Sequence, residues 1–230
     1  MRRTVITGAN RGLGLEMTRQ CLAAGDQVFA TCRDVAAAKE LRELKGQGDL
    51  TILEMDLKEP AQVISALAEV PRRIDGLDLL LNNAGVMPEG ENPTNLDADT
   101  MLDTFRVNCV GPMLVVRELL PLLKQGAEPK ILDISSQLGS LDHKQSGGLY
   151  SYCATKAALN MLSRTLAHDL RRFGITVLAI HPGWVQTDMG GRRAPLAVED
   201  AVRGILRVAA TAGLEDSGKF LTWEGEEHPW

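Results

Sequence analysis

Short apolar runs rich in β-branched residues alternate along the chain with longer stretches of helical period. The apolar runs predict strands at residues 3–7, 27–32, 50–56, 77–85, 130–136, 175–183 and 218–223. The stretches between them predict helices at residues 12–25, 36–46, 60–70, 99–124, 151–173 and 198–212. Pro60 opens one of these helices and Gly25 and Gly174 end two others, as the helix-terminal preferences of proline and glycine favour.

The order of these elements predicts the fold class. Strands that alternate with helices, and that are apolar at successive positions, are typical of a parallel sheet covered by helices on both faces. We therefore expect a single doubly wound α/β domain over residues 1–230, with a mostly parallel seven-stranded sheet. Residues 86–98 and 138–149 fit neither pattern and are expected to form long irregular loops.

Composition and charge narrow the class of protein. The chain is 44% apolar and 24% charged with a net charge of −5, which is ordinary for a folded domain in water, and its basic pairs are scattered. Nucleic-acid binding is therefore not indicated. No apolar stretch reaches the length of about 18 residues that a membrane span requires, and the first residues enter a strand without a signal-like apolar region. We expect a cytoplasmic protein with no membrane partner.

The cysteines bear on redox state and metal binding. Cys21, Cys32, Cys109 and Cys153 form no C-x-x-C pair and have no zinc-like spacing. Because most of their neighbours are apolar, we expect buried free thiols, a reducing compartment and no metal site.

A glycine-rich turn joins the first predicted strand to the first predicted helix. It reads "TGANRGLG" at residues 7–14, with glycine at Gly8, Gly12 and Gly14. Glycine lets the backbone turn tightly and approach a pyrophosphate, and the N–H groups that open the helix then face the anion. An ordinary strand-to-helix turn is the alternative, but the strand–turn–helix context favours a dinucleotide site.

The end of the second predicted strand, "TCRD", bears on which dinucleotide binds. Arg33 stands at this strand end, and Arg11 lies within the glycine turn. Guanidinium groups match the geometry of a 2′-phosphate, so the two arginines favour NADP(H) over NAD. Asp34 could instead serve a ribose 2′-hydroxyl, and Arg33 could be a solvated residue at a strand end.

Several segments, in order along almost the whole chain, resemble the short-chain dehydrogenase/reductase (SDR) family. They are "TGANRGLG", "MDL" at 55–57, "NNAG" at 82–85, Asn108, "ISS" at 134–136, "YCATK" at 152–156 and "HPGWVQTDM" at 181–189. Within the family, "GGLYSYCATKAALNML", "HPGWVQTDMGG" and the closing "GKFLTWEGEEHPW" resemble the C-factor or sniffer type of carbonyl reductase.

The resemblance implies a Rossmann fold, an NADP(H) cofactor and a set of site residues. In the family pattern, Asp56 and Leu57 would flank the adenine ring, residues 83–85 would line the middle of the cofactor, and residues 182–187 would hold the nicotinamide amide and pyrophosphate. The implied cofactor-binding residues are Gly8, Asn10, Arg11, Gly12, Leu13, Gly14, Arg33, Asp56, Leu57, Asn83, Ala84, Gly85, Tyr152, Lys156, Pro182, Gly183, Val185 and Thr187. The implied catalytic residues are Asn108, Ser136, Tyr152 and Lys156.

Tyr152 and Lys156 have the chemistry that carbonyl reduction requires. Reduction by NADPH needs a proton donor, and a free phenol with a pKa of about 10 is a weak acid. Lys156 lies four residues after Tyr152, on one face of a predicted helix, and its ammonium is expected to lower the pKa of the phenol. A Tyr-x-x-x-Lys pair is common without function. Tyr150 has Ala154 at the same offset, so we expect it to precede the helix as a pocket wall or packing residue.

Ser136 and Asn108 complete the implied set. A hydroxyl at position 136 can hydrogen-bond the substrate oxygen and stabilise charge that develops on it. In the family, the asparagine sits at a helix distortion and supports a water beside the lysine. Taken alone, Ser136 could be a turn residue, and Asn108 a capping or core amide. Gly111-Pro112 indicates a local irregularity here.

These residues predict an oxidoreductase that transfers hydride between nicotinamide and a small carbonyl or alcohol substrate. The alternative is a dinucleotide-binding signalling or regulatory protein of the C-factor type with little turnover.

A homo-oligomer, with a dimer favoured, is expected through helices 99–124 and 151–173. Ser136 and Tyr152 are sixteen residues apart, a few more than in most relatives, so "LDHKQSGG" is expected to bulge beside the site. His143 in this segment is expected to be either solvated or near substrate. Candidate border residues are Val86, Leu138, Leu149, Trp184 and Met189.

Overall fold

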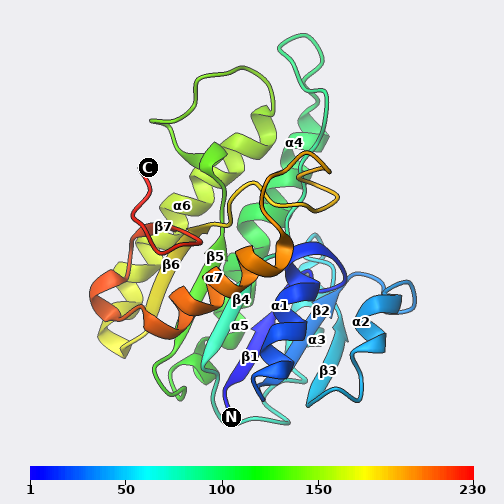
Figure 1. Cartoon of the computed structure of the whole chain (residues 1–230), viewed down its shortest axis with the longest axis vertical. Coiled ribbons are helices and arrows are strands. Elements are labelled where there is room, and N and C mark those ends of the chain that lie inside the picture. The colour runs from blue at the N-terminus through cyan, green and yellow to red at the C-terminus, as the bar shows by residue number, and fades with distance from the viewer.

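Seven strands form one sheet in the order β3-β2-β1-β4-β5-β6-β7 in the computed structural model, which describes residues 1–230 (Figure 1). The strands are β1 (Arg3–Ile6), β2 (Gln27–Cys32), β3 (Leu50–Glu54), β4 (Leu79–Asn82), β5 (Lys130–Ile134), β6 (Thr176–His181) and β7 (Phe220–Thr222). All six neighbouring pairs are parallel, which confirms the predicted doubly wound sheet. The strand order reverses between β1 and β4, which is where such sheets bind their ligands.

Helices cover both faces of the sheet. They are α1 (Gly12–Ala23), α2 (Lys39–Glu43), α3 (Pro60–Leu67), α4 (Ala98–Phe105), α5 (Gly111–Leu123), α6 (Tyr150–Leu170) and α7 (Val198–Thr211). One core cluster packs α1, α2 and α7 against the sheet, and a second packs α3, α5 and α6 against the opposite face. Successive strand residues enter opposite clusters, as Val5 and Ile6 do in β1, so both must be apolar.

The single helix predicted over residues 99–124 is interrupted. A π-helical turn, Arg106–Val110, joins α4 to α5, and the N–H of Gly111 bonds to the oxygen of Arg106. Pro112 has no N–H for the α-helical pattern, which favours a wider turn. A Cβ at Gly111 would lie 2.8 Å from Cβ of Leu57, so the turn needs glycine here.

Two other predicted boundaries were wrong. The helix expected at 36–46 is only the short α2, because Asp34 accepts a hydrogen bond from the N–H of Ala37 at 2.9 Å and holds the preceding segment in a turn. Tyr150 is the first residue of α6 rather than a residue before it. The four cysteines are free, and all but Cys153 are buried.

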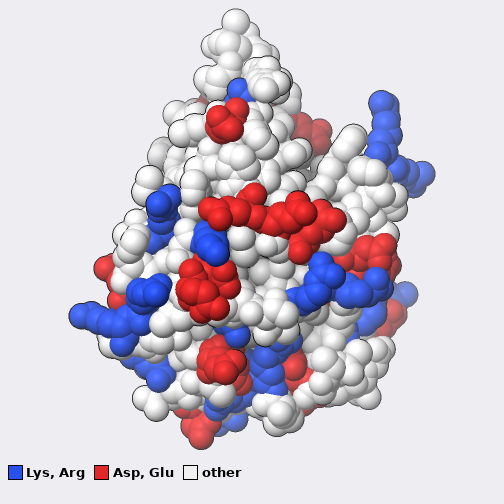
Figure 2. Space-filling view, turned by 60° about the vertical axis from the view of Figure 1, so that its left-hand side comes forward, with Lys and Arg blue, Asp and Glu red and all other residues white.

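The surface carries interspersed charge. Acidic and basic side chains lie side by side over the face in Figure 2, without a continuous basic area on that face. None of the helices combines the length and the apolar character that crossing a bilayer demands.

Candidate active site

The candidate site lies along the carboxyl ends of β1, β4, β5 and β6. Because all strands are parallel, these ends share one edge of the sheet, and the predicted site residues follow them in sequence. The irregular segments 86–98 and 138–149 extend beyond this edge at the top of Figure 1. The fold therefore gathers side chains that are far apart in the sequence.

The glycine turn after β1 is packed too tightly for side chains. Gly8 has a φ of +66°, a left-handed conformation that favours glycine. A Cβ at Gly14 would lie 2.2 Å from the oxygen of Gly8 and 2.5 Å from Nδ2 of Asn83. The start of α1 therefore sits directly against the turn, as a cradle for a pyrophosphate requires.

Thr7 and Asn83 fasten this turn to the end of β4. The buried hydroxyl of Thr7 accepts hydrogen bonds from the N–H groups of Asn83 at 3.0 Å and Ala84 at 3.1 Å. The amide of Asn83 donates to the oxygens of Thr7 at 3.0 Å and Gly8 at 3.1 Å. A role for Thr7 was not predicted from the sequence, although its place between a buried strand and the first glycine was a usable signal.

The two arginines proposed for the 2′-phosphate differ in their surroundings. Arg33 is exposed at the end of β2 and makes no hydrogen bond or ion pair. Arg11 instead pairs with Asp188 at 3.0 Å, from the glycine turn to the loop after β6. Asp34 is engaged by the N–H of Ala37, which leaves Arg33 as the available group at this strand end.

Lys156 is buried beneath the site and directed at β5. Its ammonium donates a hydrogen bond to the main-chain oxygen of Ile134 at 2.7 Å. Burial lowers the pKa of Lys156 to about 8, while Cys109 and Asp133 act in the opposite direction. A Cβ at Gly85 would lie 3.7 Å from the lysine nitrogen and 3.4 Å from Oδ1 of Asn108, which places these groups around one point.

The expected lowering of the Tyr152 pKa was wrong for this structure. Burial raises the pKa of Tyr152 to about 12, and the hydroxyl of Ser136, as a hydrogen-bond partner, opposes the shift. The nitrogen of Lys156 lies 5.6 Å from the centre of the phenol ring, and its hydrogen bond goes to Ile134. Desolvation of the phenolate therefore outweighs the stabilisation that the ammonium was expected to supply.

The side chains of Ser136 and Asn108 both form hydrogen bonds with main-chain groups of nearby loops. Oγ of Ser136 accepts from the N–H of Leu138 at 3.1 Å, which leaves its proton available for a further bond. Oδ1 of Asn108 accepts from the N–H of Val86 at 2.9 Å, and its Nδ2 donates to the oxygen of Val86 at 2.9 Å and to Thr155 at 3.0 Å. Asn108 thus joins the π-helical turn to the first residues of loop 86–98 and to α6.

A buried polar cluster behind Lys156 was not predicted from the sequence. Asp133 in β5 accepts hydrogen bonds from Nδ2 of Asn82 at 2.8 Å and from Oγ of Ser163 at 2.6 Å. Burial raises the pKa of Asp133, and these two bonds and Lys156 oppose the increase. These residues stand in otherwise apolar strand and helix patterns, so only their proximity in the fold gives them a shared role.

The remaining residues that the family pattern implied lie at two places. Leu57 is a core residue, so only its main chain could flank an adenine, and Asp56 accepts a hydrogen bond from the N–H of Lys58 at 2.9 Å.

The side chain of Thr187 lies next to Gly12, so the segment after β6 meets the glycine turn. This segment contains Pro182 and Gly183, which are partly exposed, and the buried Val185; in the turn, Asn10 is exposed and Leu13 partly buried.

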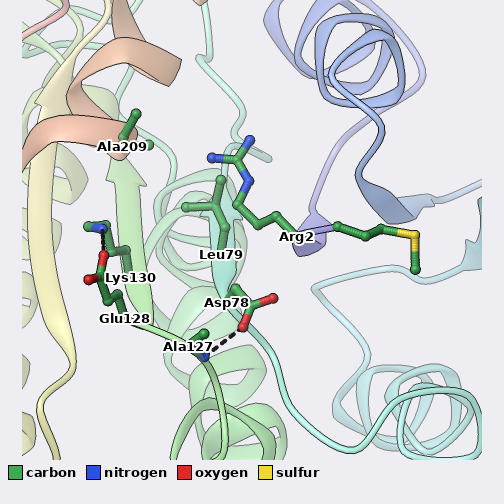
Figure 3. A pocket seen from close by; sticks show the side chains of 9 residues that line it. Arg2, Asp78, Leu79, Ala127, Glu128, Lys130 and Ala209 are labelled. Atoms are coloured by element: carbon green, nitrogen blue, oxygen red, sulfur yellow. Dashed lines mark hydrogen bonds and ion pairs between the residues drawn. The ribbon is translucent and has the colours of Figure 1, made fainter.

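A hollow of about 340 Å³ lies at the amino ends of β1, β4 and β5, away from the candidate site (Figure 3). Its charged side chains have partners. Asp78 accepts from the N–H of Ala127 at 2.7 Å and pairs with Arg3 at 2.7 Å, and Lys130 lies 4.0 Å from Glu128. These pairs hold the sheet edge together and leave no convergent catalytic groups there.

Fold and site together are those of an oxidoreductase of the doubly wound α/β class. The family model for short chain dehydrogenases matches residues 2–195. This chain belongs to the short-chain dehydrogenase family, which confirms the family that the sequence motifs indicated.

Individual relatives point in the same direction. The C-signal protein of Myxococcus xanthus is 44% identical over 154 residues, covering 67% of this chain and 93% of that protein. A 1-hydroxy-2-glutathionyl-2-methyl-3-butene dehydrogenase of Rhodococcus sp. (strain AD45) is 31% identical over 234 residues, and this similarity covers 100% of both chains.

Two solved carbonyl reductases have nearly the same fold. The NADPH-bound carbonyl reductase from chicken fatty liver superposes with a TM-score of 0.95 at 37% identity, covering 100% of this chain and 99% of its own. Carbonyl reductase Sniffer of D. melanogaster superposes with a TM-score of 0.94 at 34% identity, covering 100% of both chains. The present chain is thus an oxidoreductase of the same kind.

Proposed function

We propose that this protein is an NADP(H)-dependent carbonyl reductase that transfers hydride between nicotinamide and a carbonyl or alcohol substrate, with Tyr152 as the proton donor or acceptor. The observation that carries the proposal is the meeting of the Tyr152 phenol, the Ser136 hydroxyl and the buried Lys156 ammonium beside a glycine turn. A module that only bound a dinucleotide would not need these three groups together.

The glycine turn fits an NADP(H) pyrophosphate. A side chain at Gly14 would collide with the turn, and Thr7 and Asn83 hold the cradle in shape. Arg33, exposed and without an acidic partner, is the group that would bind the 2′-phosphate. The NADPH-bound chicken carbonyl reductase, which is similar over the whole chain, supports this cofactor. We therefore favour NADP(H) over NAD.

The chain's own residues would manage the proton. When bound, the reduced nicotinamide supplies the hydride. Tyr152 holds its proton at pH 7, as an ordinary phenol also does, and can give it to the more basic alkoxide oxygen of a reduced carbonyl. Burial, which raises the pKa of Tyr152 to about 12, makes the phenol a weaker acid and opposes this transfer. Ser136 would hydrogen-bond that oxygen and orient it. Lys156 is mostly protonated at neutral pH with a pKa of about 8, and its charge favours the phenolate once the proton has left.

A dinucleotide-binding signalling protein with little turnover is the second candidate. The 44% identity to the C-signal protein supports it. The intact Ser136, Tyr152 and Lys156 favour the reductase, although an enzyme whose biological output is signalling would satisfy both.

We also propose a cytoplasmic homodimer. The apolar side chains of Leu102 in α4, Val110 in the π-helical turn and Met161 in α6 are exposed, on the helices expected to form the contact. Three buried free thiols favour a reducing compartment. Sedimentation equilibrium of the purified protein tests the assembly.

The reductase proposal is tested by NADPH oxidation with a panel of aldehydes, ketones and quinones. Tyr152→Phe should lower turnover by about 10³-fold or more, the scale of losing a proton-transfer residue, while NADPH still binds. Tyr150→Phe is the matched control and should keep wild-type turnover. Tight NADPH binding by the wild type without turnover of any carbonyl would favour the signalling candidate instead.

A further inference from the structure

The last residues of the chain contact the loop that precedes the catalytic helix. The main-chain oxygen of Trp230 accepts hydrogen bonds from Oγ of Ser140 at 3.1 Å and from the N–H of Asp142 at 3.2 Å. Figure 1 shows the C end of the chain beside the segment 138–149. Two points of this loop are therefore held by a segment about 90 residues further along the sequence.

The side chain of Trp230 fixes that segment to the body of the protein. Its ring lies 5.5 Å from the ring of Phe220 in β7, and the guanidinium of Arg164 in α6 lies 5.2 Å from it. The N–H of His228 also bonds to the oxygen of Phe220 at 2.7 Å. Residues 228–230 are thus seated between the last strand and the catalytic helix.

Three of the four histidines connect this segment to both sides of the site. The His228 ring lies 4.9 Å from that of His143, in the loop, and 5.4 Å from that of His181, at the end of β6. Nδ1 of His181 accepts from the N–H groups of Gln137 at 3.2 Å and Gly183 at 3.3 Å. The contacts therefore reach the residue after Ser136 and the segment implied to hold the nicotinamide.

The loop itself begins against the catalytic lysine. A Cβ at Gly139 would lie 2.7 Å from the main-chain carbon of Lys156, so the turn after Ser136 packs directly on α6. Ser140 is buried, whereas the next residue, Leu141, is 81% exposed. Trp184, in the loop after β6, is 53% exposed. These two apolar side chains stand on loops that follow neighbouring strand ends.

We propose that residues 228–230 determine substrate specificity by holding loop 138–149, with Leu141, as one apolar wall of the site for bulky aromatic carbonyl compounds. This inference rests on the proposed reductase function. Release of the segment would let the loop move away, which weakens binding of a substrate that reaches the wall. A small carbonyl that contacts only Ser136 and Tyr152 would be unaffected.

The test compares Trp230→Ala with the wild type, using acetonaphthone as the bulky substrate and propanal as the small one. We expect KM for acetonaphthone to rise about tenfold, as for loss of a few apolar contacts, while kcat and KM for propanal and the Kd for NADPH stay within about twofold. Trp230→Phe keeps an aromatic ring on Phe220 and should restore most of the acetonaphthone KM.

Hydrogen exchange gives a readout that does not depend on turnover. The Asp142 amide should lose protection in Trp230→Ala because its acceptor is released. His228→Gln should act in the same direction, whereas His168→Gln, on an exposed histidine of α6, should not. Ser140→Ala removes the hydroxyl that donates to Trp230 and accepts from the N–H of His143, with little change in volume. It replaces Trp230→Ala in the test if that variant fails to bind NADPH.

The outcomes separate this inference from the function it rests on. Unchanged acetonaphthone KM and unchanged Asp142 exchange in Trp230→Ala would overturn the role of the segment, with the reductase intact. An equal loss with both substrates would also overturn it, because the segment would then support the whole site. Wild-type protein that binds NADPH but reduces neither compound contradicts the reductase function itself.

Discussion

The carboxylate of Glu91 accepts hydrogen bonds from both the N–H and the hydroxyl of Ser151, the residue before Tyr152. The hydrogen bond from the Ser151 nitrogen to the Glu91 carboxylate is 2.9 Å long. Leu149, which precedes α6, makes no side-chain cap of its own. Loop 86–98 therefore supplies the cap for α6, and the first turn that carries Tyr152 depends on it.

Glu91→Ala should impair catalysis more than cofactor binding. Loss of a helix cap costs about 1 kcal/mol, and we expect the looser first turn to lower kcat several-fold with little change in the Kd for NADPH. Glu89→Ala, a neighbouring exposed acid in the same loop, is the matched control. Equal kcat in the two variants would argue against a role for the cap.

Arg33→Ala should relax the choice of cofactor. Removing a charge-assisted bond to the 2′-phosphate costs roughly 1.5–3 kcal/mol, so the ratio of kcat/KM for NADPH to that for NADH should fall about 10- to 100-fold. Arg42→Ala, on the exposed side of α2, should leave the ratio unchanged. An unaltered ratio in Arg33→Ala would place the 2′-phosphate elsewhere, and Arg11 would be the next residue to test.

Gly14→Ala should damage both the fold and the cofactor site. Its Cβ would lie 2.2 Å from the oxygen of Gly8, so α1 and the glycine turn must move apart. Strain of this kind costs about 1–3 kcal/mol, and NADPH affinity should fall more than tenfold. Gly147→Ala introduces the same methyl group into open space and should change neither urea unfolding nor NADPH titration.

His181 should make the protein sensitive to acid. Its pKa falls from 6.5 to about 4, mainly because of burial, so the unfolded state binds the proton first. Between these two pH values the unfolded chain holds more protons than the folded one, and stability decreases as the pH is lowered. One pKa unit corresponds to about 1.4 kcal/mol, which gives a loss of up to roughly 3 kcal/mol for this group.

Urea unfolding at several pH values between 4 and 7 measures that effect. His181→Asn should show a shallower loss of stability towards acid than the wild type, because asparagine does not titrate. His168→Asn, an exposed position, should keep the wild-type slope. Parallel curves for wild type and His181→Asn would show that the protonation of His181 is not what limits acid stability.

The strands and the glycine turn could be predicted because their signals are local. A strand buried on both faces is apolar at every position, as in residues 79–81, and the glycines of residues 7–14 stand between one strand and one helix. The irregularity of the long helix also had a local signal in Gly111-Pro112, although the π-helical form of the turn did not.

Contacts between distant segments left no such signal. Glu91 and Ser151 are 60 residues apart, and Ser140 and Trp230 are 90 apart, so neither pair forms a sequence pattern. The Tyr152 pKa was misjudged for a related reason. Its sign depends on how far the phenol is buried and where the Lys156 ammonium points, and both are properties of the folded chain.

The parallel sheet separates the two ends of every strand, and this has a practical consequence for Met1. Met1 is 86% exposed and borders the hollow at the amino edge, whereas Tyr152 and the long loops lie at the carboxyl edge. A linker joined at Met1 would attach the protein to a resin or sensor surface with its candidate active site turned towards the bulk solution.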